Sequence, residues 1–368
     1  CKFTKHNLFF NLYKIQIINH QFFHDLALQQ YGKILTIPTQ RAAIYDRNGK
    51  PLALNKQSIS ACIIRSECGN KDKLLDFLKI NFPQALSRFL SSSSNFFFIK
   101  RRLTDEEQGI IRQAMLKEIH LIEEESRYYP LHCAGHIIGR TDINNAGLFG
   151  LELYYDKQRS GSPCKAYIEK DARYGLLYFN KETKVEAHQG NPIHLTLDAT
   201  LQYLVHETLK DMVATWTASE GSAIVMDPTN GEIMALAQVP NFDPNDTSTL
   251  DIAMTKNRIL TERHELGSVI KIFTAAAGLE EGLVTFDELI DCKNKTTAYL
   301  AGRKINTVSG RGIIPFWQVI AASNNIGIAT VAIRLGRQLY DHYVRLGFTS
   351  HLGIGFPAEQ TGFVNPPD

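Results

Sequence analysis

The chain has 368 residues, of which 44% are hydrophobic and 21% are charged, values that are ordinary for a protein with buried cores. Its length predicts two domains, or three at most. Its net charge of +2, from 40 basic and 38 acidic residues, argues against a dedicated nucleic-acid-binding protein. No apolar run reaches the ~18 residues that a membrane-spanning helix needs. The six cysteines form no Cys-x-x-Cys pair, which argues against a zinc or thioredoxin-like site.

The first predicted elements are a helix and a hairpin. Apolar side chains recur every three or four residues within residues 9–30, which is the stripe of an amphipathic helix. Residues 41–53 contain an Asn-Gly pair after β-forming residues, the strongest short signal of a β-hairpin. The charges of Arg41, Asp46 and Arg47 predict a local network of ion pairs with a structural role.

The next segment carries polar helices and a possible metal site. Residues 70–125 predict helices, interrupted by a serine-rich loop at residues 91–95. Residues 132–136 (His-Cys-Ala-Gly-His) contain metal-ligand types, but no carboxylate accompanies them at ligand spacing. The sequence therefore gives a metal site there no support. We place a domain boundary between residues 1–189 and residues 190–368.

Beyond that boundary, helices alternate with strands. Residues 193–197 predict a strand, and Asp198 can cap the helix that follows it. The apolar residues of that helix, Leu204 and Trp216 among them, predict its packed side. Residues 221–237 predict a β-hairpin around an Asn-Gly turn. Helices combined with an antiparallel sheet indicate the α+β class.

The stretch around Ser268 and Lys271 is the first candidate for chemistry. The two residues are three apart, so they share a face if Ser268 opens a helix. An amine beside a hydroxyl can take its proton, and the alkoxide then attacks a carbonyl group. The helix start adds partial positive charge and free N–H groups near the developing anion. The simpler interpretation of Ser268 is a helix N-cap.

A second Ser-x-x-Lys copy, Ser162 to Lys165, serves as an internal control. The residues that follow Ser162 are charged and mixed, whereas those that follow Ser268 have an apolar helical pattern. A catalytic serine on a buried helix fits only the second context. The apolar positions of that pattern are Ile272, Phe273, Ala276 and Leu279, with Gly282 as the stop.

A second polar element, residues 323–325 (Ser-Asn-Asn), lies 55 residues after Ser268 (323 minus 268). It stands between two apolar helical runs, so its polar groups need partners if they are buried. An ordinary turn between helices is one interpretation. As part of a site, Ser323 would relay protons between Lys271 and a leaving amine, and Asn325 would hold Lys271 and the substrate amide.

Taken in order, these landmarks resemble those of the class B penicillin-binding proteins, which are peptidoglycan D,D-transpeptidases. Ser268 and Lys271 match the family's Ser-x-x-Lys motif, and residues 323–325 match its Ser-x-Asn motif. Other segments are similar to landmarks of the pedestal, or dimerisation, domain and to the first strands of the transpeptidase domain. These segments are residues 41–53, 127–130 and 147–152 for the pedestal and 221–245 for the transpeptidase domain.

The resemblance implies both a fold and a reaction. The fold would be an elongated pedestal at residues 1–189, then a serine transpeptidase (penicillin-binding/β-lactamase-like) domain at residues 190–368 with an antiparallel sheet flanked by helices. Ser268 would attack the penultimate D-Ala carbonyl of a stem peptide with Lys271 as the base, and an amine from a neighbouring stem would complete the cross-link. β-Lactams would acylate the same serine. Neither a metal nor an organic cofactor is implied.

The resemblance also implies partners and a location. The partners would be peptidoglycan stem peptides, β-lactams, a membrane glycosyltransferase and divisome proteins, without nucleic acid. The protein would lie on the periplasmic side of the bacterial inner membrane, held by a single N-terminal anchor that this chain does not contain. The run at residues 170–173 (Lys-Asp-Ala-Arg) favours a role in division over one in elongation.

Two alternatives remain open at this point. One is a β-lactam sensor or β-lactamase-related protein, although the large preceding module argues against a plain β-lactamase. The other is a non-catalytic divisome scaffold. The chain contains no Lys-Thr-Gly, the family's third motif, which would help to bind the substrate carboxylate. We therefore expect a chain truncated before that motif and inactive as given.

Overall fold

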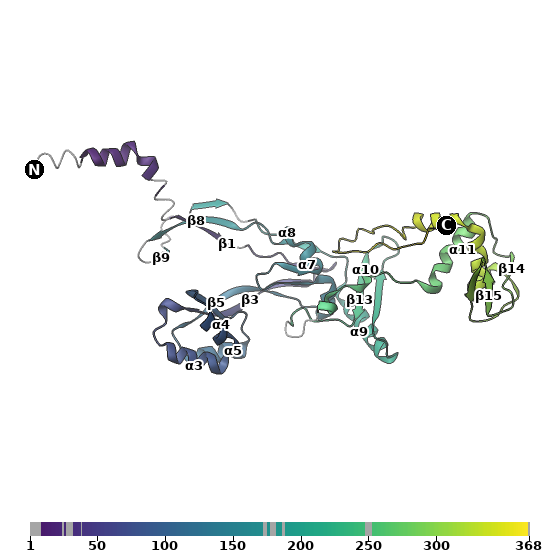
Figure 1. The fold of residues 1–368 in the computed structure, drawn as a ribbon, viewed down its shortest axis with the longest axis horizontal. Coiled ribbons are helices and arrows are strands. Elements are labelled where there is room, and N and C mark those ends of the chain that lie inside the picture. The colour runs from purple at the N-terminus through teal and green to yellow at the C-terminus, as the bar shows by residue number, and fades with distance from the viewer. Residues whose placement is uncertain are drawn as a thin grey trace, which may run out of the picture. The chain divides into compact units, whose positions relative to one another are not determined.

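The computed structural model describes residues 9–23, 26, 32–37, 39–171, 175–176, 182–185, 188–246 and 252–366 (Figure 1). The chain divides into two compact units, Cys1–Thr255 and Lys256–Asp368. Both contain helices and antiparallel strand pairs, so the predicted α+β class is confirmed. Among the described residues, no helix is both long enough and apolar enough to cross a membrane.

The helix predicted near the N-terminus is present in its described part. Residues 9–13 and 20–23 are α-helical, and a π-helix, η1 (Lys14–Ile18), lies between them. The apolar side chains of this segment are exposed, with 42% of Leu12 and 63% of Phe22 accessible.

The largest sheet of the first unit is built around one long strand, β3. It pairs antiparallel with β5 from Leu54 opposite Tyr128 to Ile63 opposite Ile119. The hairpin predicted at the Asn-Gly turn is confirmed, because β2 pairs antiparallel with β3. The strands of this sheet are β2 (Ile44–Tyr45), β3 (Pro51–Ile64), β4 (Phe96–Lys100), β5 (Ile119–Tyr128) and β11 (Ile193–His194).

Strands β4 and β5 correct the prediction of helices alone across residues 70–125. In β4, Phe97 and Ile99 are buried while Phe96 and Lys100 are exposed, the alternation of a strand with one covered face. Both strands pair with β3, whose residues lie well before them in the sequence. These two stretches form strands because β3 provides hydrogen-bond partners for their backbone groups.

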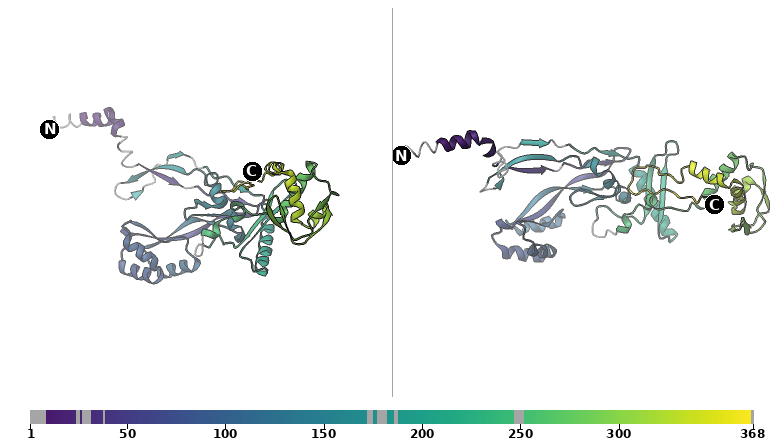
Figure 2. Two further views of the ribbon diagram at one scale, coloured as in Figure 1. Left: turned by 45° about the vertical axis from the view of Figure 1, so that its right-hand side comes forward. Right: turned by 45° about the horizontal axis from the view of Figure 1, so that its top comes forward.

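Three helices pack against the end of the sheet formed by β3, β4 and β5 (Figure 2). Asn70 caps the first of them by accepting from Lys73 N, and Thr104 forms a capping box with Glu107 at the start of the third. The helical segments here are η2 (Arg65–Glu67), α3 (Lys71–Asn81), α4 (Pro83–Ser91) and α5 (Asp105–Ala114). Their shared core includes Ile63, Leu74, Leu78, Phe89, Phe97, Ile99 and Ile111.

A second antiparallel sheet has β8 in its centre. The control residue Ser162 stands just before this strand, and its backbone N–H donates to His188 O at 2.9 Å. The second Ser-x-x-Lys copy therefore lies in extended chain and opens no helix, which agrees with its use as a control. The strands are β1 (Gly32–Ile37), β8 (Cys164–Asp171), β9 (Gly175–Leu176) and β10 (Glu182–Val185).

A series of short elements brings the charged side chains of Glu152 and Arg159 into the interior of the first unit. Two glycines permit the close approach on which this depends: a Cβ on Gly139 would lie 1.9 Å from Phe149 O, and one on Gly150 would lie 2.6 Å from Gly139 Cα. The elements are η3 (His132–Ala134), α6 (Gly135–Ile138), β6 (Arg140–Thr141), β7 (Gly147–Phe149), α7 (Gly150–Tyr154) and α8 (Asp156–Arg159).

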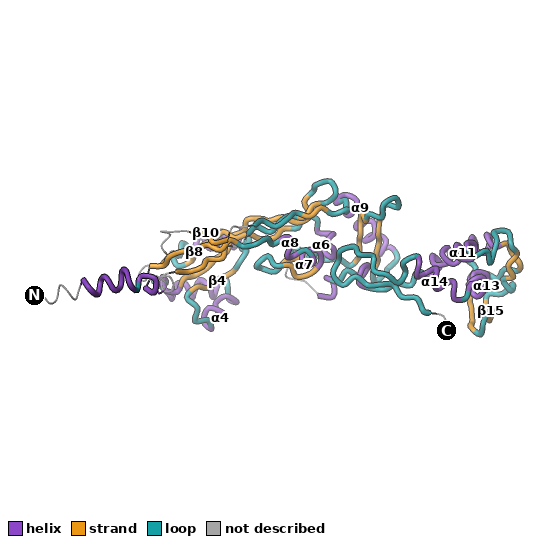
Figure 3. The backbone as a smooth tube through the Cα atoms, turned by 90° about the horizontal axis from the view of Figure 1, so that it is seen from above, coloured by secondary structure: helices purple, strands orange, loops and turns teal. Residues whose placement is uncertain are grey.

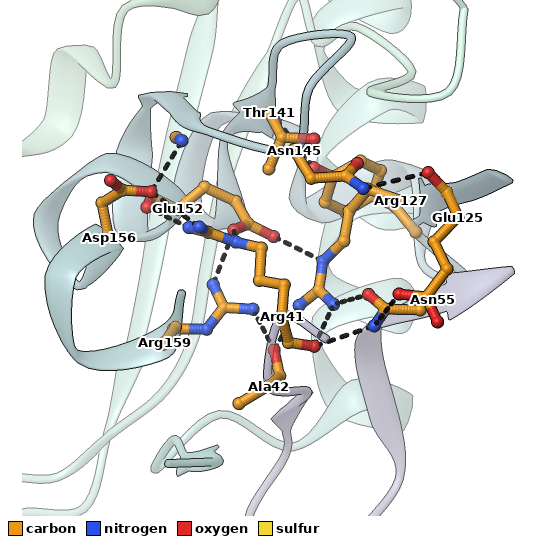
Figure 4. A network of polar contacts seen from close by, with 12 residues as sticks. Arg41, Ala42, Asn55, Glu125, Arg127, Thr141, Asn145, Glu152, Asp156 and Arg159 are labelled. Atoms are coloured by element: carbon orange, nitrogen blue, oxygen red, sulfur yellow. Dashed lines mark hydrogen bonds and ion pairs between the residues drawn. The ribbon is translucent and has the colours of Figure 1, made fainter. Parts of the chain in front are cut away.

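One buried carboxylate, that of Glu152, binds three arginines in the interior of this unit (Figure 4). Arg41 Nε and Arg159 Nη1 each donate to Oε2 of Glu152 at 2.7 Å. Arg127 Nε donates to the other carboxylate oxygen at 2.9 Å. Further N–H groups of Arg127 and Arg159 donate to Ala42 O at 2.8 and 2.7 Å. The four charged side chains are at most 7% exposed as whole residues.

The prediction that residues 41, 46 and 47 form ion pairs with one another is therefore wrong. Arg41 pairs with Glu152, which lies 111 residues away in sequence. Arg47 pairs at 3.1 Å with the half-exposed Glu232. Asp46 accepts backbone N–H groups through its carboxylate. A buried guanidinium needs a buried carboxylate, and tertiary packing decides which carboxylate is buried.

Burial and charge act in opposite directions on this network. Burial raises the pKa of Glu152, but the positive fields of Arg127, Arg159 and Arg41 outweigh it and hold that pKa below its ordinary value. Burial lowers the pKa of Arg159 to about 10, because Glu152 offsets only part of the desolvation. Glu152 and Arg159 therefore remain charged at neutral pH.

Replacing Glu152 with glutamine should strongly destabilise the first unit. Removing one partner of a buried ion pair costs about 3–5 kcal/mol, because it leaves charge buried without compensation. Chemical denaturation followed by circular dichroism measures the loss. Glu232→Gln is the matched control, since it removes only the exposed partner of Arg47 and should cost less than about 1 kcal/mol. Equal losses in the two variants would contradict a central role for Glu152.

The loop after β2 is tied to the start of helix α9 (Ala199–Thr215). Asp46 is fully buried, and its Oδ2 accepts the backbone N–H of Ala199 at 3.0 Å. Asp198 caps the helix as predicted, with its side chain accepting from Thr200 N at 2.9 Å. The hairpin of β2 and β3 thus holds the start of α9 through Asp46.

Helix α9 packs on the hairpin predicted at residues 221–237, which is confirmed as β12 (Gly221–Met226) and β13 (Ile233–Val239). The apolar side of helix α9 is not fully covered, because Leu204 is 61% and Trp216 74% exposed. The buried side instead carries Gln202, whose amide bonds both the N–H and the C=O of Leu236 at 2.7 and 2.8 Å. A polar side chain takes the covered position because it satisfies backbone groups of the strand.

The second unit groups three helices, α11, α13 and α14, around an apolar core (Figure 3). Its helical segments are α10 (Arg258–Thr261), η5 (Gly267–Val269), α11 (Ile270–Glu280), α12 (Phe316–Ala321), α13 (Asn325–Leu335) and α14 (Arg337–Arg345), after η4 (Ile252–Thr255) at the end of the first unit. Its strands form two antiparallel pairs: β14 (Leu289–Asp291) with β17 (Ile313–Pro315), and β15 (Thr297–Leu300) with β16 (Arg303–Asn306). The core includes Ala275, Ala277, Ile290, Cys292, Phe316, Val319, Val331 and Leu335.

Candidate active site

Ser268 stands at the start of a helix, as the sequence predicts. It lies in the 3-10 turn η5, and Lys271 follows in the first turn of α11. Gly267, just before Ser268, has φ +59°, a conformation that favours glycine. The helix ends at Glu280, and Gly282 follows with φ +64°, so the predicted stop is also confirmed.

The apolar positions of α11 are only partly covered, with Phe273 and Leu279 half-buried. Ile272 is 61% exposed, whereas Thr274, Ala277 and Gly278 are buried. A Cβ on Gly278 would lie 2.7 Å from a methyl carbon of Val331 in α13. Small residues occupy the contact because α13 approaches α11 closely, and the bulkier isoleucine stays outside.

Ser323 lies in the turn between α12 and α13, in a left-handed backbone conformation with φ 49°. For a residue with a side chain this conformation costs about 1–3 kcal/mol, which the surrounding contacts must offset. Asn324, which is 1% exposed, caps α13 by accepting from Gly327 N at 2.9 Å. Ser323 and Asn325 thus flank a buried asparagine that anchors the turn.

The two segments bring three side chains into one line of hydrogen bonds. Lys271 Nζ donates to the hydroxyl of Ser323 at 2.8 Å and to its backbone carbonyl at 2.7 Å. The Ser323 hydroxyl donates to Oγ of Ser268 at 3.1 Å. The structure therefore places Ser323 between the residues predicted as nucleophile and base.

The environment of Lys271 shifts its amine toward the neutral form. Burial lowers the pKa of its amine below the ordinary value of 10.5. The two groups that accept its hydrogen bonds are a hydroxyl and a carbonyl, neither of which carries a negative charge. A larger fraction of free amine is therefore available at neutral pH than for a solvated lysine.

Asn325 makes different contacts from the predicted ones. Its amide nitrogen donates to Asn306 O at 2.7 Å, and its backbone N–H donates to Oγ1 of Thr307 at 3.3 Å. The predicted bond to Lys271 is not among the hydrogen bonds of the described residues, although the two side chains line one pocket of about 350 Å³. No sequence pattern marks Asn306 and Thr307 as neighbours of this turn, because only tertiary contact brings the end of β16 to it.

The structure supports no metal site among the residues it describes, where no three His, Cys, Asp or Glu side chains come together. His136, from the segment considered above, is buried, with its ring nitrogens 3.3 Å from Asn241 Oδ1 and 3.1 Å from Leu236 O. Burial lowers its pKa to about 4, so the ring is neutral at pH 7. This histidine therefore has a packed, structural environment.

Comparison with known families gives two matches along the chain. The model described as Penicillin-binding Protein dimerisation domain matches residues 36–195. The model described as Penicillin binding protein transpeptidase domain matches residues 221–368, the range that contains Ser268 and the Ser323 turn.

Curated proteins with similar sequences are peptidoglycan enzymes and a sporulation protein. The chain is 29% identical to the Probable peptidoglycan D,D-transpeptidase PbpC of Pseudomonas aeruginosa, over 95% of this chain and 63% of that protein. It is 28% identical to the Peptidoglycan D,D-transpeptidase FtsI of Escherichia coli K12, over 90% and 57%. It is 27% identical to the Stage V sporulation protein D of Bacillus subtilis, over 96% and 56%. The chain thus spans 56–63% of the length of these relatives.

Solved structures share the fold. A chain of the complex between Penicillin-Binding Protein (PBP2) and MreC from Helicobacter pylori matches with a TM-score of 0.72 and 19% identity, over 91% of this chain and 69% of that one. A peptidoglycan synthetase from Bifidobacterium adolescentis matches with a TM-score of 0.66 and 19% identity, over 91% and 67%.

Proposed function

Because the chain belongs to the class B penicillin-binding proteins, with a dimerisation domain and then a transpeptidase domain, we propose that it cross-links peptidoglycan by serine acyl transfer. The observation that carries this proposal is the line of hydrogen bonds from Lys271 through Ser323 to Ser268. As part of the same proposal, we keep the domain division at residues 1–189 and 190–368.

In the first half-reaction, Ser268 attacks the penultimate D-Ala carbonyl of a stem peptide. Neutral Lys271 is the base. Both hydrogen bonds of the line then reverse: Ser268 donates to the Ser323 hydroxyl and Ser323 donates to Lys271 Nζ, because a hydroxyl can accept one hydrogen bond while it donates another. The Ser323 hydroxyl thus passes the proton of Ser268 to Lys271. The tetrahedral intermediate then collapses, the C–N bond breaks, and the terminal D-Ala leaves as an amine that takes the proton back. The product is an ester of Ser268 with the stem peptide.

In the second half-reaction, an amine of a neighbouring stem peptide attacks this ester. The same relay removes a proton from the incoming amine and returns one to Oγ of Ser268 as the C–O bond breaks. Lys271 is neutral again at the end of the cycle. Asn325 contributes by binding the substrate amide, as its position at the rim of the pocket shared with Lys271 supports. β-Lactams enter the first half-reaction because they mimic D-Ala-D-Ala.

A labelled penicillin tests the proposal. The protein, as its gene encodes it, should form one covalent adduct per chain and release the label slowly. Mass spectrometry of the intact protein measures the stoichiometry. Continuous release of a chromogenic β-lactam would instead indicate the β-lactamase alternative, and a protein that forms no adduct would be the non-catalytic scaffold.

The rate of this acylation should rise with pH. Only the neutral amine of Lys271 accepts a proton, and its pKa is lowered by burial, so the rate should increase through a midpoint below 10.5, the ordinary lysine value. Stopped-time labelling at a series of pH values gives the profile. A rate that is flat or falls across this range would contradict Lys271 as the base.

We further propose a division role for the whole protein, at the periplasmic side of the inner membrane. Support comes from similarity to a relative named FtsI and from the charged run at residues 170–173, of which residues 172–173 lie outside the described residues. Its partners would be peptidoglycan stem peptides, a membrane glycosyltransferase and divisome proteins. One structural relative comes from a complex with MreC, which supports protein partners of this kind.

A further inference from the structure

The turn that carries Ser323 is held by a segment that none of the catalytic motifs contains. This segment, residues 306–309, follows the hairpin of β15 and β16 and contacts the turn at three points. Asn325 donates its amide to Asn306 O at 2.7 Å and its backbone N–H to the hydroxyl of Thr307 at 3.3 Å. Asn324 donates to Ser309 O at 3.5 Å.

Thr307 is the one residue of this segment that reaches the turn through a side chain. Its own backbone is fixed in the hairpin, because its N–H donates to Thr296 O at 2.8 Å. Its hydroxyl then accepts the N–H of Asn325, which is the first residue of α13. The first N–H groups of a helix have no partner within the helix, so an acceptor from outside decides how that end is held.

The conformation of the turn makes this support necessary. Ser323 has φ 49°, a conformation that residues with side chains rarely adopt and that persists only where the surroundings impose it. If the start of α13 shifts, Ser323 can relax, and its hydroxyl then leaves the line between Lys271 and Ser268. The contact of Thr307 with Asn325 lies two residues from Ser323, close enough to control that relaxation.

We propose that Thr307 is a positioning residue of the acyl-transfer site: through Asn325 it fixes the turn so that the Ser323 hydroxyl bridges Lys271 and Ser268. The proposal rests on the proposed function, because it assigns Thr307 to the same reaction. Thr307 touches none of the three relay groups, so its substitution removes no reacting atom.

The test compares the acylation rate constant at saturating labelled penicillin in the protein as its gene encodes it. Thr307→Val keeps the shape of the side chain but removes the acceptor, and the rate constant should fall by roughly 10- to 100-fold, since a misplacement of about 1 Å costs on the order of 10²-fold. Thr307→Ser restores the hydroxyl and should restore most of the rate.

The matched control is Thr297→Val. Thr297 lies in the same hairpin and donates its hydroxyl to the Asn306 side chain at 3.0 Å, without touching the turn. The Thr297→Val variant should have a rate constant close to that of the unmodified protein. Both valine variants remove one hydroxyl from the hairpin, so a general loss of hairpin stability would affect them alike.

Folding is measured separately from rate. A variant that only destabilises the unit lowers the fraction of protein that can be labelled and its Tm, but leaves the rate constant of the folded fraction unchanged. Thr307→Ala serves as a second hydroxyl deletion, measured at a temperature where it is folded. An unchanged rate constant in the folded fraction of either deletion, or equal losses in Thr307→Val and Thr297→Val, would overturn the inference. If the unmodified protein is not acylated at all, the proposed function fails first and this inference with it.

Discussion

Replacing Ser268 with alanine should abolish covalent labelling by penicillin. The substitution removes the only atom that forms the ester, Oγ, while it leaves the 3-10 turn η5 and helix α11 with a residue that favours both. Ser268 is exposed, so no core contact is lost. Gel fluorescence after incubation with a labelled penicillin gives the extent of acylation, and thermal unfolding confirms that the variant is folded.

The second copy of the motif provides the control for this experiment. Ser162→Ala changes the same residue type ahead of a lysine at the same spacing, but in extended chain before β8. It should label as fully as the unmodified protein. An adduct that mass spectrometry places on Ser162, or labelling that survives Ser268→Ala, would remove Ser268 from the mechanism.

Replacing Lys271 with arginine should slow acylation by about 10²–10⁴-fold, the usual effect of losing a general base. Arginine keeps the positive charge and the long side chain, but its guanidinium does not deprotonate in proteins and so accepts no proton from the Ser323 hydroxyl. The rate constant of labelling measures the loss. Binding of penicillin before the reaction should change much less, because the substitution preserves charge.

Lys304→Arg is the matched control for Lys271→Arg. Lys304 is exposed and lines the same pocket of about 350 Å³, so it tests whether any lysine of that pocket is sensitive to the exchange. Its rate constant should stay near that of the unmodified protein. A similar loss in both variants would indicate an effect of pocket shape or charge, and an unaffected Lys271→Arg would exclude Lys271 as the base.

The sequence predicts local structure well where the signals are local. The start of α11 at Ser268, its stop at Gly282, the Asn-Gly hairpin and the cap at Asp198 are all present, because each depends on the conformation of a few consecutive residues. For the same reason the two elements with catalytic spacing could be located, although their mutual geometry could not.

The errors arise where distant parts of the chain decide. The sequence predicts helix across β4 because the partner of this strand, β3, lies far earlier in the sequence. The apolar patterns of α9 and α11 do not reveal that Gln202 and Gly278 lie at the contacts, because a strand backbone and a neighbouring helix decide this. Ser323 was predicted to support the relay, but its place between Lys271 and Ser268 depends on a backbone conformation that no sequence pattern reveals.

The buried charge network also has a consequence in time. Arg41 lacks its buried carboxylate until Glu152 exists. Asp46 Oδ1 bonds Asn48 and Lys50 within the hairpin, but its Oδ2 lacks its partner until Ala199, 153 residues later. At synthesis rates of about 5–20 residues per second, the ribosome needs roughly 8–30 s to cover that distance. Throughout this interval the Arg41 side chain and Oδ2 of Asp46 stay hydrated, since their distant partners have not been made. A chain released early would expose these arginines and an open strand edge to proteases and to neighbouring nascent chains.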